Sequence, residues 1–266
     1  MDEATVRRLN AINRQFYATV ADDFDATRGQ AWAGWERLAA YIQPLPPTSS
    51  PGGEGENRQV PLSPLPEFGE GPGVGSGEKA ISVLDVGCGN GRFGVFLREK
   101  LGTVTYHGLD NSAALLAKAR ISLPDAILEE RDIVEHPPDT GTYALVVLFG
   151  VLHHLPGAEQ RTTFMRALAE RVRPGGLLVF TAWRFYEYPR FRDRIVPWEA
   201  DVQVETGDYL LDWRRGARAL RYCHYVDDAE ADQLSTATGL ERVAQYRADG
   251  FTGAVNLYVV LRKSSA

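Results

Sequence analysis

The sequence predicts an α/β fold, with a seven-stranded, mostly parallel sheet, helices on both faces and an antiparallel pair of strands at the C-terminal end. From residue 80 onward, short apolar runs alternate with helical patterns, which is typical of a parallel sheet whose strands are joined by helices. A glycine-rich turn connects the first of these runs to the first helix. The last two runs, 240–246 and 254–261, are the expected antiparallel pair.

The first expected strand is buried and ends in an acid, Asp85, immediately before the glycine turn. The expected strands are 81–85, 104–109, 126–129, 143–149, 177–181, 240–246 and 254–261. A first helix is expected directly after the turn, and three more are expected at 112–122, 158–172 and 227–237. Ser112 caps the first of these three, Pro174-Gly-Gly ends the second and Gly239 ends the third.

The N-terminal part of the chain, residues 1–43, is expected to form a helical arm whose two apolar faces meet at a polar junction, 22–29. Residues 44–79 differ in kind, because eight of them are Pro and eight are Gly. Such a segment buries too little apolar surface to offset the entropy lost on ordering, so we expect a disordered insertion, either neutral or serving as a tether. Residues 80–266 then form the main domain.

Composition narrows the class of protein. The chain has 266 residues, of which 44% are hydrophobic, enough for a sizeable core. A net charge of −6 argues against a polycationic nucleic-acid binder, so any RNA contact needs a local patch. Cys88 and Cys223 are too few for a disulfide framework or a zinc cage, so we expect reduced thiols and no metal site. With neither an apolar run of ~20 residues nor a signal sequence, a soluble cytoplasmic protein without membrane contact is expected.

The glycine turn has the pattern Asp-x-Gly-x-Gly-x-Gly, from Asp85 to Gly91. The glycines let a ligand approach the main chain, and the following helix directs its N-terminal N–H groups at the same point. The third glycine of a dinucleotide fingerprint would fall at Arg92, so the spacing disfavours a dinucleotide. An acid beside a helix N-terminus suits the ammonium and carboxylate groups of S-adenosylmethionine (SAM). The turn resembles the first motif of class I SAM-dependent methyltransferases, which implies cofactor contacts from Asp85, Gly87, Cys88, Gly89 and Gly91.

Further cofactor residues are expected where later strands end. Asp110 follows the glycine turn by about twenty residues, where an acid accepts the two ribose hydroxyls, although it could also cap the next helix. Asp132 resembles the acid that receives the adenine amino group, although an Asp in a loop is often only a turn former. The resemblance adds Asn111, Ile133 packed on the adenine ring, and Phe149 at the end of the fourth strand.

Segments outside this core resemble a narrower family, the tRNA wobble-uridine carboxymethyl methyltransferases. The matching pieces are 17–28 with Trp32, 150–155, 181–183, 196–198, 207–213 and 220–224. This resemblance covers residues 13–42 and 80–262. It implies esterification of the carboxylate of 5-carboxymethyluridine at the tRNA wobble position, under a substrate lid at 184–225. It also adds Tyr17 and Arg28 as cofactor residues and a small zinc-binding activator subunit as a partner. Cys223 departs from the pattern, because the family usually has an aromatic residue there.

A carboxylate acceptor is already ionised at neutral pH, so its methylation needs no general base. The site has to align the reacting groups, exclude water and hold an anion. Arg28, Arg184 and His153 or His154 are the expected anion clamp, with Trp183 as a stacking wall. Alternatively, Arg28 binds only the methionine carboxylate, the histidines are satisfied core residues, and Trp183 is lid packing.

RNA contact is expected from four arginines, at positions 214, 215, 218 and 221, in a stretch without acids. Arginines beside Trp213 and Tyr222 suit phosphate contacts and base stacking, although a charge run is commonly only a solvated face. Two other functions stay open. A small-molecule O-, N- or C-methyltransferase shares every core motif, and a non-catalytic SAM-binding protein could act as an assembly partner.

Overall fold

The computed structural model describes residues 1–26, 30–42, 80–199, 201–214 and 216–265. The expected insertion at 44–79 lies outside the described residues, as do Arg28 and Arg215.

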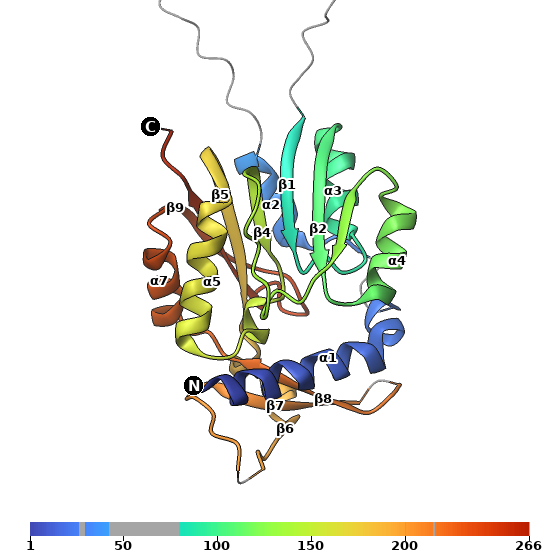
Figure 1. Ribbon diagram of the computed structural model, residues 1–266, viewed down its shortest axis with the longest axis vertical. Coiled ribbons are helices and arrows are strands. Elements are labelled where there is room, and N and C mark those ends of the chain that lie inside the picture. Colours follow the sequence, from blue (N-terminus) through green and yellow to red (C-terminus); the bar gives the residue numbers. More distant parts are fainter. Residues whose placement is uncertain (27–29, 43–79, 200, 215, 266) are drawn as a thin grey trace, which may run out of the picture.

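A seven-stranded sheet forms the centre of the molecule, with strand order β3-β2-β1-β4-β5-β10-β9, which confirms the predicted α/β fold (Figure 1). Its strands are β1 (Ile81–Val86), β2 (Val104–Asp110), β3 (Ile127–Glu130), β4 (Tyr143–Leu148), β5 (Val172–Trp183), β9 (Glu241–Ala248) and β10 (Asn256–Arg262). The first five are parallel, and β10 lies antiparallel between β5 and β9. The carboxyl ends of β1, β2 and β4 therefore meet at one edge, where open α/β sheets bind ligands.

Helices cover both faces of this sheet, which explains why the central strand β4 is apolar along its whole length. One face carries α2 (Ala33–Ile42), α3 (Arg92–Leu101) and α4 (Ala113–Ser122), whose side chains share a core with β1, β2 and β10. The other face carries α5 (Ala158–Glu170) and α7 (Asp228–Ala237).

Helix α1 (Glu3–Ala26) lies across the carboxyl edge of the large sheet, between it and a second, smaller sheet (Figure 1). The small sheet has the order β6-β7-β8, with β6 (Ile195–Val196), β7 (Asp208–Trp213) and β8 (Ala219–His224) antiparallel to one another. Short helical turns η1 (Leu152–His154), η2 (Phe185–Glu187) and α6 (Pro189–Arg192) link the two sheets. The segment expected to be a substrate lid thus contains three strands that the sequence did not reveal.

Two boundaries differ from the prediction for a common reason. The helix expected at 158–172 ends at Glu170, and β5 begins at Val172, before the Pro-Gly-Gly sequence that was expected to separate them. Gly175 donates from its N–H to the carbonyl of Lys263, and Gly176 accepts from the N–H of Lys263. The C-terminal end of the chain therefore extends the sheet through these glycines.

A buried network of charges joins the small sheet to the helices. The Arg161 guanidinium on α5 pairs with Glu230 at 2.7 Å and with Glu205 at 3.2 Å. His224 on β8 contacts Asp208 through Nδ1 and Glu230 through Nε2, each at 2.7 Å. Burial acts to lower the pKa of His224, but the bonds to these two carboxylates raise it above its ordinary value. The network fixes the position of β8 relative to α5 and α7.

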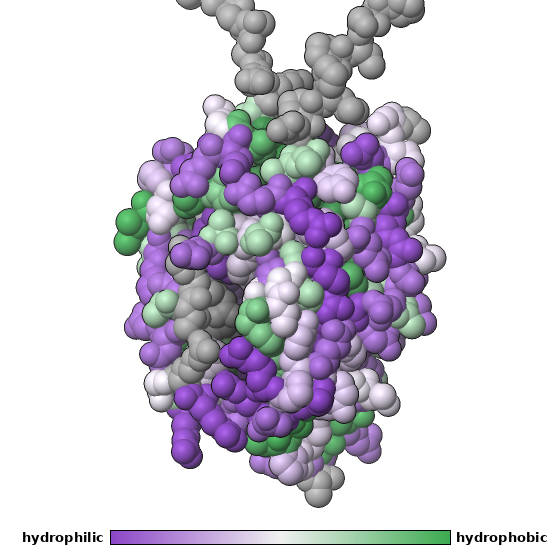
Figure 2. Space-filling model, turned by 180° about the vertical axis from the view of Figure 1, so that it is seen from behind, coloured by the Kyte–Doolittle hydropathy of each residue, from purple (hydrophilic) through white to green (hydrophobic). Residues whose placement is uncertain are grey.

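The surface is mostly hydrophilic on the face seen in Figure 2, with apolar residues scattered among charged ones. Within the described ranges, the exposed large hydrophobic side chains are Tyr41, Ile121, Ile127, Tyr186, Leu220 and Phe251. Among the described residues, no helix has both the length and the apolar character that crossing a bilayer requires.

Candidate cofactor and acceptor site

A cavity of about 490 Å³ opens at the carboxyl edge of the large sheet. Most of the site residues predicted from the sequence line it, although they are far apart in the chain. These residues are Tyr17, Asp85, Gly87, Cys88, Gly89, Asp110, Asn111, Asp132, Ile133, Phe149, His153, His154 and Trp183. The structure thus brings the expected cofactor residues and the expected acceptor residues into one cavity.

The glycine turn is held by its neighbour strand and by close packing. The N–H groups of Gly87 and Cys88 both donate to the carbonyl of Leu109 at the end of β2, at 2.7 and 2.9 Å. Gly87 has φ +79°, and a Cβ there would overlap the side chain of Val151. Both requirements exclude a side chain at Gly87.

Gly91 also has φ +79°, but it does not line the cavity. It precedes α3, and a Cβ would lie 2.9 Å from Leu123 Cδ1 and 3.1 Å from Ala119 Cβ. Gly91 therefore allows α3 to pack closely against α4. Its expected contact with the cofactor stays a prediction, because Gly91 is not among the residues that line the cavity.

Asp85 is a buried carboxyl group that faces the cavity from the end of β1. Among the described residues, its hydrogen-bond partner is the Tyr106 hydroxyl, which donates to Oδ2. Burial raises the pKa of Asp85 to about 7, the hydrogen bond from Tyr106 opposes that rise, and the nearby charge of Asp110 adds to it. A buried acid in this state is stabilised by a cationic ligand, so Asp85 fits the ammonium group of SAM.

Asp110 ends β2 and holds the glycine turn from the opposite side. Its Oδ2 accepts from the N–H of Gly89 at 2.8 Å, and its Oδ1 accepts from the N–H of Ser112 at 2.9 Å. Each carboxylate oxygen keeps a second lone pair, so the group can still accept from a pair of ribose hydroxyls. The helix cap that was the alternative role for Asp110 is supplied by Ser112, whose Oγ accepts from Leu115.

Asp132 lines the cavity next to Ile133 and also binds the N-terminal helix. Its Oδ2 accepts from Asn10 Nδ2 at 2.9 Å and from Arg14 Nη1 at 3.0 Å, while Oδ1 accepts from the N–H of Val134. Asp132 therefore fixes α1 over the cavity, a role that the sequence did not indicate because its partners lie more than a hundred residues away.

His154 is held in the acceptor half of the cavity by hydrogen bonds at both ring nitrogens. Its Nδ1 lies 3.1 Å from the carbonyl of Tyr222, which can only accept, so Nδ1 carries the proton. Nε2 then accepts from the Tyr17 hydroxyl at 2.9 Å. His153 packs against His154 and against Trp183, with ring centroids 4.1 and 5.2 Å apart.

Arg221 points into the cavity from β8, between two aromatic rings. Its guanidinium carbon lies 4.6 Å from the centroid of Trp183 and 5.4 Å from that of Phe16. Within the described part of the chain, Arg221 makes neither an ion pair nor a side-chain hydrogen bond. A cation held by ring faces leaves its N–H groups for an anionic ligand.

The remaining expected cations are placed differently from the prediction. Arg184 is only 1% exposed, donates to the carbonyl of Val226 at 2.7 Å, pairs with Asp228 and does not line the cavity, so the structure does not place it where it was expected to hold the acceptor anion. Arg214 pairs with Asp212 at 2.6 Å, whereas Arg218 is exposed. Arg221, the fourth arginine of the expected RNA patch, faces the cavity, and RNA contact by the patch stays a prediction. Cations that line the cavity but were not predicted are Arg92, Arg131, Arg190 and Arg194.

Comparisons with known proteins agree with this geometry. Residues 83–176 match the family model of a methyltransferase domain. The chain is 36% identical over 109 residues to dTDP-3-amino-3,6-dideoxy-alpha-D-glucopyranose N,N-dimethyltransferase of Streptomyces fradiae, covering 41% of this chain and 42% of the relative. It is 30% identical over 126 residues to trans-aconitate 2-methyltransferase of Azoarcus sp. (46% and 48%). It is 23% identical over 227 residues to the tRNA (carboxymethyluridine(34)-5-O)-methyltransferase ALKBH8 of Mus musculus (85% and 24%).

Among solved structures, the chain resembles SAM-bound CalS10, an amino pentose methyltransferase from Micromonospora echinaspora. The TM-score is 0.51 and the identity 25%, over 70% of this chain and 84% of that one. The chain spans less than half the length of each of the three curated relatives. The fold and the matched domain nevertheless define a class: the chain has the class I methyltransferase fold and carries a SAM-dependent methyltransferase domain, with SAM as its cofactor.

Proposed function

We propose that the protein transfers the methyl group of SAM to a carboxylate oxygen of its acceptor, and that the acceptor is 5-carboxymethyluridine at the tRNA wobble position. The observation that carries this proposal is Arg221, a cation that faces the acceptor half of the cavity between Trp183 and Phe16 and makes no ion pair among the described residues. A fixed cation without a counter-ion favours an anionic ligand over a neutral or cationic one.

The cofactor half of the cavity has the groups that SAM requires. Asp85 would hold its ammonium group, Asp110 its ribose hydroxyls, and Ile133 and Asp132 its adenine ring and amino group. When bound, SAM supplies a methyl group on a positively charged sulfur, which any nucleophile of adequate basicity can accept. The work left to this chain is therefore to place the acceptor and to keep water out.

The acceptor half can do both without a base. An ionised carboxylate needs no proton removed, so His154, which is hydrogen-bonded to the Tyr17 hydroxyl and to the carbonyl of Tyr222, serves to shape the cavity. Arg221 orients the acceptor anion, and Trp183 closes one side of it. Helix α1 covers the opening because Asn10 and Arg14 bind Asp132 on one side and Asn13 accepts from the N–H of Tyr222 on the other.

Support for a tRNA acceptor comes from outside the cofactor motifs. The similarity to ALKBH8, whose name specifies carboxymethyluridine 34 of tRNA, extends over 85% of this chain and so includes the lid at 184–225 as well as the core. The exposed Arg218 remains available for phosphate contact beside the cavity. A small activator subunit is part of this proposal, as a partner that would help to position the tRNA.

A small-molecule acceptor is the second candidate, and the identities of 36% and 30% to an amino-sugar and a trans-aconitate methyltransferase favour it. The two relatives differ in acceptor chemistry, because trans-aconitate is an anion and the amino sugar carries a basic nitrogen. Arg221 favours the anion. We therefore expect a carboxylate acceptor whether the substrate is tRNA or a small molecule. The two candidate functions differ in the size of the molecule that carries this carboxylate.

The test replaces Arg221 by Gln and compares methyl transfer from labelled SAM to unmodified tRNA and to trans-aconitate. Because a charge-assisted hydrogen bond contributes about 1.5–3 kcal/mol, the variant should lose about 10- to 100-fold in kcat/KM with an unchanged affinity for S-adenosylhomocysteine. Arg214→Gln is the matched control, since Arg214 is exposed and paired with Asp212. Full activity of the Arg221→Gln variant on a carboxylate acceptor would contradict the proposal.

A further inference from the structure

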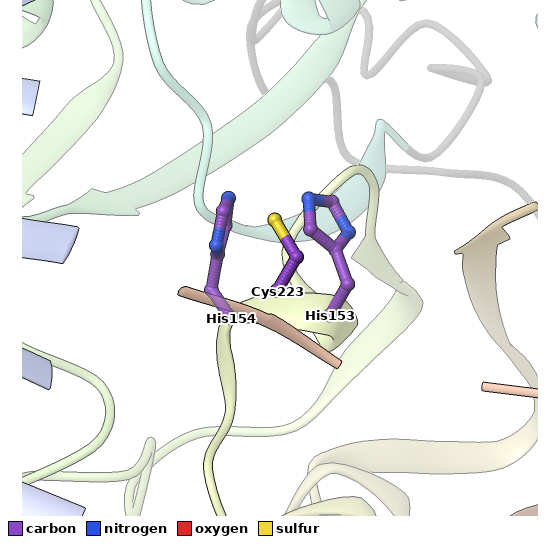
Figure 3. A group of neighbouring side chains, drawn as sticks. All are labelled: His153, His154 and Cys223. Carbon is purple, nitrogen blue, oxygen red and sulfur yellow. The ribbon is translucent and has the colours of Figure 1, made fainter. Parts of the chain in front are cut away.

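Two imidazoles that line the cavity lie together with a buried thiol, and the proposed reaction does not explain this cluster. His153 and His154 come from η1, and Cys223 comes from β8. One potential ligand atom from each residue lies within 4.8 Å of the others, and all three side chains are buried. Figure 3 shows the sulfur of Cys223 lying between the two imidazole rings.

The donor set is specific for one group of metal ions. Thiolate sulfur and imidazole nitrogen are the ligands of Zn²⁺ and similar borderline-soft cations, whereas Mg²⁺ and Ca²⁺ prefer oxygen. Bond lengths of about 2.0–2.3 Å in a tetrahedral site place ligand atoms about 3.5 Å apart. The cluster therefore needs movements of about 1 Å to close on an ion, which side-chain rotation at its three residues can supply.

His154 is already oriented as a metal-binding histidine is. Its Nδ1–H donates to the carbonyl of Tyr222, the residue next to Cys223 in β8. Metal-ligating histidines commonly donate their second N–H to a backbone carbonyl in this way, which fixes the tautomer and leaves Nε2 as the ligand. The partner that a cation would have to displace from Nε2 is the Tyr17 hydroxyl, at 2.9 Å.

The remaining coordination position has access to a ligand from the cavity. His153 and His154 line the cavity, whereas Cys223 does not, so a cation held by all three would have the acceptor space on its other side. Alternation along β8 puts Cys223 on the same face as Arg221, which lines the cavity beside Trp183.

We propose that His153, His154 and Cys223 form a binding site for a zinc-class cation, with its fourth position open to the acceptor cavity. Binding replaces the S–H bond of Cys223 by a sulfur–metal bond and releases the proton to solvent. It also breaks the hydrogen bond from Tyr17 to His154, which connects α1 to the cavity floor. This site does not depend on methyl transfer, and its occupancy would control access of the acceptor.

Titration of the metal-free protein with Co²⁺ tests the site without any activity measurement. The expected result is one equivalent bound, with the visible absorption of tetrahedral Co²⁺ and a sulfur-to-cobalt charge-transfer band, and displacement of both by Zn²⁺. Cys223→Ser should abolish the charge-transfer band and weaken binding by about 100-fold or more, since even loss of an outer partner typically costs 10–100-fold. Cys88→Ser is the matched control and should leave both bands unchanged, because Cys88 lies in the glycine turn.

Tyr17→Phe should strengthen Co²⁺ binding, whereas Cys223→Ser should weaken it. It removes the hydrogen bond that competes for Nε2 of His154, so Co²⁺ should bind about threefold more tightly or better. If Cys223→Ser fails to fold, the Co²⁺ spectrum of the unaltered protein still tests the proposal. A Co²⁺ spectrum without a sulfur charge-transfer band would overturn the proposal, and so would a band that survives in Cys223→Ser.

Discussion

The state of Asp85 makes the strength of cofactor binding depend on pH. Asp85 is buried with a pKa of about 7, and only its ionised form attracts an ammonium group. About one tenth of the carboxyl groups are ionised at about pH 6, and about nine tenths at about pH 8. The affinity for S-adenosylhomocysteine, which carries the same ammonium group as SAM, should therefore rise about tenfold over this interval.

Calorimetry at several pH values measures both the affinity and the protons exchanged. Below pH 7 binding should release close to one proton per site, because Asp85 must ionise to pair with the ligand, and above this pH the release should fade. Asp85→Asn should weaken binding by about 10- to 100-fold at pH 8 and remove the pH dependence. Tyr106→Phe removes the hydrogen bond that lowers the pKa of Asp85, so it should move the transition to higher pH.

The control for this series is Asp125→Asn, which alters an exposed acid whose ion-pair partner is Arg98; neither residue lines the cavity, so the profile should stay unchanged. An affinity that does not vary between pH 6 and pH 8 in the unaltered protein would refute the reasoning about Asp85. So would a pH dependence that persists in Asp85→Asn.

Further predictions concern the turn, the buried charges and Arg184. Gly87→Ala should lower the melting temperature and abolish S-adenosylhomocysteine binding, because the backbone strain at φ +79° and the overlap with Val151 cost about 1–3 kcal/mol each. An unchanged binding affinity in calorimetry would contradict this prediction. Protonated His224 stabilises the fold, and because its pKa is raised, this stabilisation is complete below the ordinary value of 6.5 and is lost as pH rises through the raised value. Urea titrations should therefore show the free energy of unfolding falling over that interval. His224→Gln should remove this part of the pH dependence. Arg184→Met should lower the urea midpoint while S-adenosylhomocysteine binds as before; lost binding with an intact fold would return Arg184 to the site.

The cofactor half of the site could be predicted from the sequence because its signals are local. Asp85, Gly87 and Gly89 lie within one turn, and the order of strands fixes where Asp110 and Asp132 meet them. Parallel strands end at the same edge, so finding the strands was enough to place these residues together.

The acceptor half was predicted less well because its contacts are long-range. Arg221 was grouped with its neighbours in sequence, but side chains alternate along β8, so Arg221 faces the cavity while the Tyr222 hydroxyl bonds to Asp208. Recognising β8 as a strand would have separated Arg221 from the exposed Arg218. Strand β6 has only two residues, so no periodic pattern could reveal this strand.

Arg184 illustrates the same limit. It follows Trp183 directly, and because Trp183 lines the cavity at the end of β5, the next side chain is directed away from it, toward Val226 and Asp228. Adjacency in sequence suggested a shared role, whereas the geometry at the end of a strand separates the two side chains. Asn10, Arg14 and their bonds to Asp132 had no local signal at all.

The central claim is methyl transfer to a carboxylate, and the stability of the product tests it most directly. The protein is incubated with methyl-labelled SAM and tRNA lacking the wobble ester, the tRNA is isolated, and the label is followed through mild alkaline treatment and nucleoside mass analysis. The account predicts label in the wobble nucleoside that is released as methanol by alkali, as a methyl ester must be. Label that resists alkali, in tRNA or in a small molecule, would contradict a carboxylate acceptor.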